Sequence, residues 1–262
     1  MRARSSVIAS VTSLVVSAAP LQAQSLAARV AAADNEAVTF HFTSRHGVCG
    51  DGEHFIRTSR GSYHGSFTAG RPLEPCMPGP VQVRLTVQDG VVDRVQTYVG
   101  PLRARNARDL GAVPAAEAAG YLTTIAARGS ARASGKAILP AVLADSATVW
   151  PALLAIAKDM ATRSRATRQE ALFWVSRYAS GAVAGRPNEP FLEEDGNGSG
   201  DEDLKKHAVF VLSQLPRRQG VPTLLEIARS NPSRSVRSQA MFWLGQSGDP
   251  RAIALFEAVL RP

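Results

Sequence analysis

The chain has 262 residues, of which 45% are hydrophobic and 20% charged, and its formal net charge is +8. This composition is typical of a globular protein and excludes a disordered chain, and the length suffices for two modest domains. No segment reaches the eighteen or so consecutive apolar residues that a membrane helix requires, so no membrane span is predicted.

The N-terminal segment has the pattern of a secretory signal peptide. Arg2 and Arg4 precede a mainly apolar run, 7–19, and small residues surround Ala23. The run is too short to cross a bilayer core of about 30 Å as a helix. We therefore predict a signal peptide over 1–23 and an exported mature chain, periplasmic or extracellular.

The positive charge comes mostly from arginine, and seven of the 22 acidic residues lie between Glu189 and Asp203. Such a balance could serve nucleic acid or an anionic surface. However, the basic residues are scattered singly rather than clustered with aromatics, and export removes most nucleic-acid partners. We therefore favour a solvated arginine-rich surface and expect no nucleic-acid partner.

Residues 24–100 have the alternation of β-strands. Apolar residues alternate with polar ones from Val38 to Phe42 and again from Val81 to Val87, and Asp89-Gly90 then makes a tight turn into the run 91–99. Alternation flanking such a turn predicts a hairpin with one buried face. With a short strand near 54–58, these elements predict a small antiparallel β domain.

This domain holds both cysteines, Cys49 and Cys76, together with His54 and His64. Two cysteines in one small exported domain most often pair, so we predict a disulfide. One alternative is a metal site formed by these four side chains, although their spacing lacks a tight ligand pair. A second is a catalytic Cys49 assisted by His54, for which no orienting partner is recognisable.

Residues 101–113 are predicted to be a linker, and helices follow with an internal duplication. The segment from Trp150 is matched about seventy residues later by the segment from Val221, and in each copy an Ala-x-Phe-Trp motif follows. The spacing of Trp174 and Trp243 places both on an apolar helical stripe, so we expect both to be buried.

The last hairpin carries a family resemblance. Apolar residues recur at helical spacing on both sides of a break, GQSGDP, in which Gly245 and Gly248 can take the positive φ that ends one helix, while Asp249 and Pro250 can begin the next. The run LG…GDPRA, from Leu244 to Ala252, resembles the signature of HEAT repeats, particularly the short kind known from phycobilin lyases. The resemblance implies an all-α solenoid over 114–262, and hence an α+β multidomain fold class.

Phe173 and Phe242 occupy equivalent places in the two copies, off the stripe that faces the partner helix. One interpretation is that they fill the contact between adjacent repeats. The other is that they form an exposed aromatic interaction surface. Both interpretations stay open on the sequence alone.

An acidic insertion, 180–203, interrupts the array and resembles a calcium loop. Oxygen-bearing residues occupy alternate positions around a glycine, as a hard cation requires. The candidate ligands are Asp195, Asn197, Ser199, Asp201 and Asp203. The last position should be glutamate and is Lys206, so we predict calcium binding that is weak at best, and we favour a solvated acidic loop.

These observations favour an exported, non-catalytic protein–protein interaction scaffold without a cofactor, whose partner is another protein. The whole pattern is similar to secreted HEAT-repeat domain-containing proteins, and such repeats are mostly binding scaffolds. The alternatives are a metal-binding or enzymatic module that uses the Cys/His-containing β domain, and an arginine-rich binder of anionic surfaces.

Overall fold

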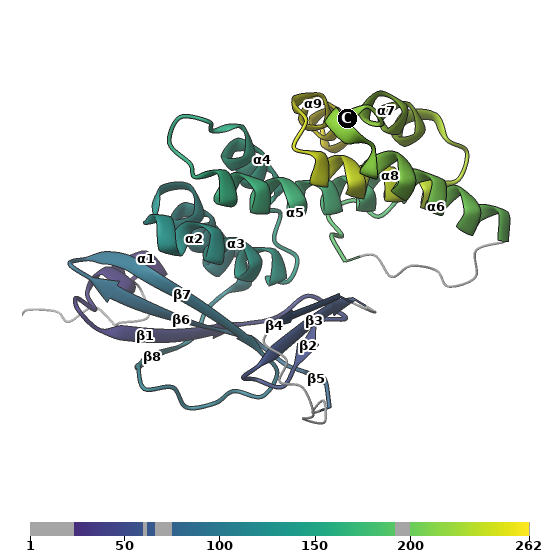
Figure 1. Cartoon of the computed structure of the whole chain (residues 1–262). Coiled ribbons are helices and arrows are strands. Elements are labelled where there is room, and N and C mark those ends of the chain that lie inside the picture. Colours follow the sequence, from purple (N-terminus) through teal and green to yellow (C-terminus); the bar gives the residue numbers. More distant parts are fainter. Residues whose placement is uncertain (1–23, 60–61, 66–74, 192–199, 262) are drawn as a thin grey trace, which may run out of the picture.

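The computed structural model describes residues 24–59, 62–65, 75–191 and 200–261. A β-rich region precedes a helical region, which confirms the predicted α+β class (Figure 1). The strands are β1 (Ala37–Phe42), β2 (Cys49–Gly50), β3 (Phe55–Ser59), β4 (Ser62–Gly65), β5 (Met77–Pro78), β6 (Val81–Gln88), β7 (Val91–Val99) and β8 (Arg108–Ala112). The helices are α1 (Leu26–Ala31), α2 (Ala115–Arg128), α3 (Ala131–Leu143), α4 (Trp150–Lys158), α5 (Arg165–Val183), α6 (Gly200–Gln214), α7 (Val221–Ser230), α8 (Arg234–Ser247) and α9 (Pro250–Leu260). The predicted signal peptide lies outside the described residues.

The larger sheet has the strand order β7-β6-β1-β8. Strand β1 runs antiparallel to β6, with Phe40 opposite Val83, and both side chains are fully buried. The predicted hairpin joins β6 to β7 through Asp89 and Gly90, which have φ of 50° and 72°. Two successive positive φ values match the twist of a two-residue hairpin turn, which explains the Asp-Gly pair.

The smaller sheet has the order β4-β3-β2-β5 and carries the disulfide. Strand β2 pairs with both β3 and β5. Cys49 in β2 is bonded to Cys76, which immediately precedes β5, and their Cα atoms are 5.3 Å apart. The structure thus contains the predicted disulfide, which ties β2 to the residue before β5.

Residues 101–113, expected to be a linker, contain β8, which pairs in parallel with β1 at the edge of the larger sheet. The strand was missed because its side chains are exposed or half-buried and do not alternate. Its pairing depends on the backbone, and Val113 N–H continues it by donating to the His41 carbonyl at 2.9 Å. An edge strand of this kind needs no buried face.

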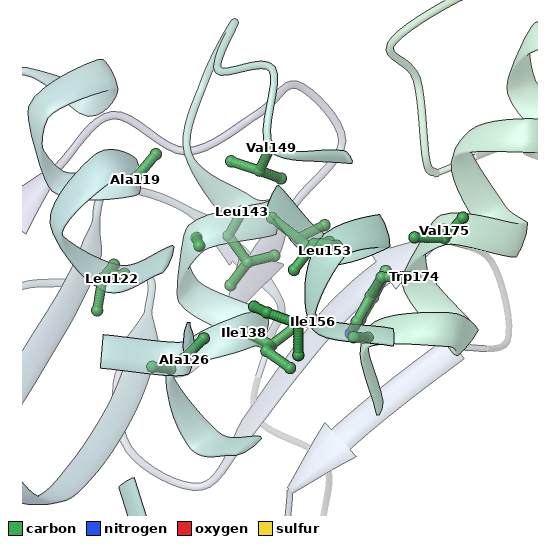
Figure 2. Packing of buried hydrophobic residues seen from close by; sticks show 14 of the residues in the cluster. Ala119, Leu122, Ala126, Ile138, Leu143, Val149, Leu153, Ile156, Trp174 and Val175 are labelled. Carbon is green, nitrogen blue, oxygen red and sulfur yellow. The ribbon is translucent and has the colours of Figure 1, made fainter. Parts of the chain in front are cut away.

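The β region and the first helices share one hydrophobic core instead of forming separate domains. Helix α3 packs against β6 and β7, and the fully buried Leu26 and Val30 of α1 belong to the same core. The core continues through α2, α3, α4 and α5, to which Leu122, Ile138, Leu153 and Trp174 belong (Figure 2). The predicted boundary near residue 100 therefore divides a continuous interior.

Capping side chains fix the starts of several helices. Ser130, Ser164 and Ser233 each accept the N–H three residues on, at 3.1–3.3 Å. At the last hairpin, Gly248 has φ of 61° and Asp249 accepts the Arg251 N–H at 2.9 Å. These bonds satisfy amide groups that a helix terminus leaves free, and they confirm a break at Gly248. Gly245, which was also predicted to end the helix, lies inside α8 without a positive φ, because it is the close point of packing against α5.

The helices form layers, but not in chain order. One layer contains α3, α5, α8 and α6, with each packed against the next. Helix α6 lies at the far end of the array, and the chain then returns through α7 and α8 so that α9 contacts α4 and α5 (Figure 1). An ion pair between Lys158 and Glu257 joins α4 to α9. The last hairpin therefore lies inside the array, whereas stacking in chain order would place it at the end.

The two copies of the duplication meet face to face. The Ser180 and Ser238 hydroxyls each donate to the other residue's carbonyl, at 3.0 and 3.1 Å. Ser176 faces Gly245 at the other end of the contact, so α5 and α8 run antiparallel. Equivalent helices of successive solenoid repeats run parallel, and this arrangement instead relates the copies by an approximate two-fold axis.

Gly245 is the closest point of that contact, and we expect Gly245→Ala to destabilise the protein. A Cβ there would collide with the Ser176 side chain between two packed helices. Overpacking of this kind typically costs 1–3 kcal/mol, although the alanine gains up to about 1 kcal/mol in helix propensity. Thermal unfolding should show a lower melting temperature.

The matched control is Gly120→Ala in α2, where nothing lies within 4 Å of the added Cβ. This change should raise the melting temperature, because only the propensity gain applies. Equal shifts in the two variants would contradict a close α5–α8 contact.

Candidate protein-binding face

A row of aromatic rings crosses α5, α8 and α6, and we call it the aromatic ladder. Its members are Phe191, Trp174, Phe173, Phe242, Trp243 and Phe210. Successive ring centroids are 4.9–6.2 Å apart, mostly edge to face. This geometry is favourable for aromatic pairs and contributes beyond simple burial. The ladder thus connects the two copies of the duplication to the end helix.

Phe173 and Phe242, the predicted interaction residues, lie at the centre of the ladder. Their ring centroids are 6.2 Å apart, and both are half-buried. The structure therefore places them in the contact between the two copies while leaving part of each ring accessible. The Arg177 guanidinium lies 5.8 Å from the centroid of Phe242, so a cation borders the accessible part.

The two tryptophans differ in burial, although both were expected in the core. Trp174 is 2% exposed and its Nε1 donates to Glu170 Oε1 at 2.9 Å. Trp243 is only half-buried, because it borders a cavity of about 520 Å³ that α6, α7 and α8 enclose. Its buried Nε1 has no acceptor among the described residues. A buried donor without an acceptor costs roughly 1–3 kcal/mol, so a bound acceptor would be favoured there.

A cleft of about 570 Å³ adjoins the ladder, between β3 and β7 on one side and α3 and α5 on the other. Its walls carry His54, Tyr98, Lys136 and Glu170, so both signs of charge are present. Glu170 belongs to both features, since it lines the cleft and holds Trp174. Glu170 thus connects the cleft, which the β region and α3 help to form, to the ladder.

An aspartate that the sequence analysis missed orients His54. Asp51 is 3% exposed and its Oδ1 accepts the N–H groups of Glu53, His54 and Phe55 at 2.7–3.1 Å. Its Oδ2 lies 3.0 Å from His54 Nδ1. Burial alone would raise the pKa of Asp51, but these hydrogen bonds hold it well below its ordinary value. The sequence could have indicated this role, because an aspartate in a turn commonly accepts N–H groups of the residues that closely follow it.

The disulfide rules out Cys49 and Cys76 as metal ligands and Cys49 as a catalytic nucleophile. Because Cys49 and Cys76 are bonded to each other, neither is a thiolate that could bind a metal or attack a substrate. Among the described residues, no group of three or more His, Cys, Asp or Glu side chains is arranged to hold a metal ion. The His54 side chain therefore pairs with the Asp51 carboxylate, and not with Cys49 as the catalytic alternative required.

The calcium candidates lie only partly within the described residues. Asp195, Asn197 and Ser199 fall outside them, whereas Asp201 and Asp203 lie in the first turn of α6. Asp203 Oδ1 lies 3.9 Å from Lys206 Nζ. Weak calcium binding stays a prediction.

Several arginines have partners within the protein instead of lying free in solvent. Arg45, Arg163 and Arg237 all donate to main-chain carbonyls, and the Arg105 guanidinium stacks 3.4 Å from the ring centroid of Tyr98. Guanidinium groups with such partners are less available to an anionic surface. This use of arginine weighs against the alternative of an arginine-rich binder of anionic surfaces.

Comparison with known families locates one match in this region. A family model described as HEAT repeats matches residues 192–262, which include α6, α7, α8 and α9. The C-terminal part of the chain is thus similar to HEAT repeats, and HEAT repeats generally serve protein interactions. No curated protein matches the chain. No solved structure matches it either.

The pKa of Asp51 predicts how acid affects stability. A carboxyl with a lowered folded-state pKa contributes stability above its unfolded value, ordinarily 3.8, and loses it as pH falls toward the folded value. Asp51→Asn keeps an acceptor but removes the charge. We expect the variant to unfold at lower urea concentration at pH 7, with the difference from the parent protein shrinking as pH falls below about 4.

Asp34→Asn provides the control, because Asp34 accepts the Gly90 N–H on an exposed turn. Its unfolding midpoint should follow that of the parent protein at every pH. If the difference in unfolding midpoint between Asp51→Asn and the parent protein did not change with pH, the loss of stability would come from the shape of the side chain and not from its charge.

Proposed function

We propose that the chain is an exported, non-catalytic scaffold that binds another protein through the aromatic ladder. The proposal depends on one observation, which is the set of half-buried rings of the ladder on a framework of packed helices. Aromatic residues are enriched at the centres of protein interfaces because they offer large contact areas at low entropic cost. The HEAT-repeat match to the helices that hold Phe242 and Trp243 agrees with it.

The expected partner presents an apolar segment to the ladder and an oxygen acceptor to Trp243. Apolar side chains fit the accessible parts of Phe173 and Phe242, and a carbonyl or carboxylate would satisfy Trp243 Nε1. The mixed charges of the adjoining cleft would then receive polar groups of the same partner.

Export is the second part of the proposal. The predicted signal peptide and the Cys49–Cys76 disulfide agree with an oxidising compartment, where disulfides persist. None of the helices in the described ranges has the length and apolarity needed to span a membrane.

A second candidate, an enzymatic role for the β region, rests on the Asp51–His54 pair at the cleft. A carboxylate that fixes one ring nitrogen leaves the other free for proton transfer. If the cleft is a binding site and not a catalytic one, His54→Gln should change only the affinity for the partner, because His54 lines the cleft. Activity toward a substrate that is lost in this variant would favour the enzyme.

A site-specific crosslink tests the partner face. Benzoylphenylalanine at position 242, irradiated in native cells, should give one discrete adduct, because the half-buried ring lies in the proposed contact. The same probe at Met160, which is 78% exposed on the α4–α5 connection, is the control. We expect no adduct there.

Adducts of equal yield at both positions would indicate non-specific collision. Absence of an adduct at 242 in a variant that folds normally would exclude the ladder as the partner face.

Intact mass of the protein from native cells tests export. We expect loss of residues 1–23 and no alkylation without reductant, followed by two labels after reduction, because both thiols are in the disulfide. Reduction should also lower stability by about 3–4 kcal/mol, the cost expected for opening a loop of this length. An intact N-terminus, or two labels before reduction, would contradict the exported form.

A further inference from the structure

Two polar side chains at the cleft of about 570 Å³ are held in place by buried partners. His54 is oriented by Asp51, which is 3% exposed and is itself fixed by three backbone amides. Glu170 is oriented by the Nε1 of Trp174, which is 2% exposed and donates to it at 2.9 Å. Side chains whose directions are fixed by buried neighbours are typical of binding sites, because the ligand then has fewer groups to order.

The hydrogen bond to Asp51 determines what His54 offers to the cleft. The pKa of Asp51 is held well below its ordinary value, so its carboxylate can only accept. The Nδ1 atom of His54, 3.0 Å from Asp51 Oδ2, must therefore carry the hydrogen. In the neutral ring Nε2 then carries a lone pair and accepts hydrogen bonds. The Glu170 carboxylate is an acceptor as well, so both oriented side chains suit a ligand that donates.

Lys136 supplies a donor to the same cleft. Its side chain is exposed and forms no ion pair with any of the residues that the structure describes. Its helix, α3, meets α5 at Gly135, where an added Cβ would lie 3.8 Å from Thr167 Oγ1. Glu170 lies about one helical turn beyond Thr167, so Lys136 and Glu170 come from adjoining turns of the two helices. The cleft thus combines a lysine ammonium with two oriented acceptors.

The other charged side chains of the cleft have partners within the protein. Glu53 Oε2 lies 3.5 Å from Arg103 Nη1, and Arg132 Nη1 lies 3.8 Å from Asp93 Oδ1. Apolar side chains complete the wall, namely those of Phe55, Ile56, Val95 and Leu139. A ligand can therefore place an aliphatic group on this wall while its polar atoms meet the donor and the two acceptors.

We propose that the cleft binds an ammonium group followed by a carbonyl oxygen and carrying an aliphatic side chain, as in the N-terminal residue of a peptide. The ammonium would donate to Glu170 and to His54 Nε2, and the carbonyl oxygen would accept from Lys136. A free amino acid has the same chemistry, with a carboxylate in place of the carbonyl. The cleft adjoins the ladder, so this assignment rests on the proposed function and names the partner's N-terminus as the group that enters the cleft.

Isothermal titration calorimetry of the mature full-length protein tests the ligand. The probes are leucyl-alanyl-alanine amide, its N-acetylated form and free leucine. We expect the unmodified tripeptide to bind at millimolar concentration or below, and the acetylated form to bind about tenfold more weakly or worse, because acetylation removes the charged donor. Leucine that binds as tightly as the tripeptide would support the same site and identify a free amino acid as its ligand. Equal affinity of the two peptides, or no binding of either the tripeptide or leucine, would overturn the proposal.

Glu170→Gln tests the role of the carboxylate. Glutamine keeps an acceptor for Trp174 Nε1 but removes the charge, so we expect about tenfold weaker binding and a melting temperature close to that of the parent protein. Lys136→Gln, at an exposed position, is a second variant that should weaken binding as well. Glu226→Gln, at an exposed position of α7, is the control and should leave the affinity unchanged. Parent affinity in Glu170→Gln and Lys136→Gln would exclude the assigned contacts.

Failure of this site and failure of the ladder give different results. If the tripeptide binds but the probe at position 242 gives no adduct, the ladder is excluded and the cleft site stands. If the probe gives its adduct but neither the tripeptide nor leucine binds, the ladder is supported and the cleft site is overturned.

Discussion

A buried guanidinium, that of Arg45, holds the β region against the helices. Arg45 is 5% exposed, and its side chain donates to the carbonyl of Val142 at 2.8 Å and to those of Ala147 and Asn188. It also reaches the hydroxyl of Tyr178 at 3.3 Å. None of these partners is a carboxylate. Burying a cation costs several kcal/mol unless its donors are satisfied, so the surrounding carbonyls must all be in place.

The partners of Arg45 explain how the free-energy cost of burying its charge is offset. Val142 lies at the end of α3, where the unpaired carbonyls of a helix carry partial negative charge. Burial raises the pKa of Tyr178 to about 12, so its hydroxyl stays neutral and able to accept. Through Tyr178 the arginine fixes α5, whose other residues reach both the cleft at Glu170 and the ladder at Phe173. One buried charge thus positions both parts of the proposed binding face.

Sequence patterns predicted the elements that bury their own side chains and missed those that depend on distant partners. The hairpin at Asp89-Gly90, the disulfide, the helices and the duplication all have local signals. Strand β8 and the orienting role of Asp51 have no local signal of comparable strength. The strand depends on pairing to β1, and the role of Asp51 depends on hydrogen bonds from backbone amides. The equivalence of Ser176 and Gly245 was visible in the alignment of the copies, but their contact across antiparallel helices was not, since repeats usually stack in chain order.

The antiparallel arrangement also explains why the ladder spans three helices. Because α8 packs directly on α5, Phe242 of α8 meets Phe173 of α5, and α6 packs on α8. Phe210 of α6 then extends the ladder through Trp243. A partner that covers the ladder would therefore contact both copies of the duplication and the end helix at once.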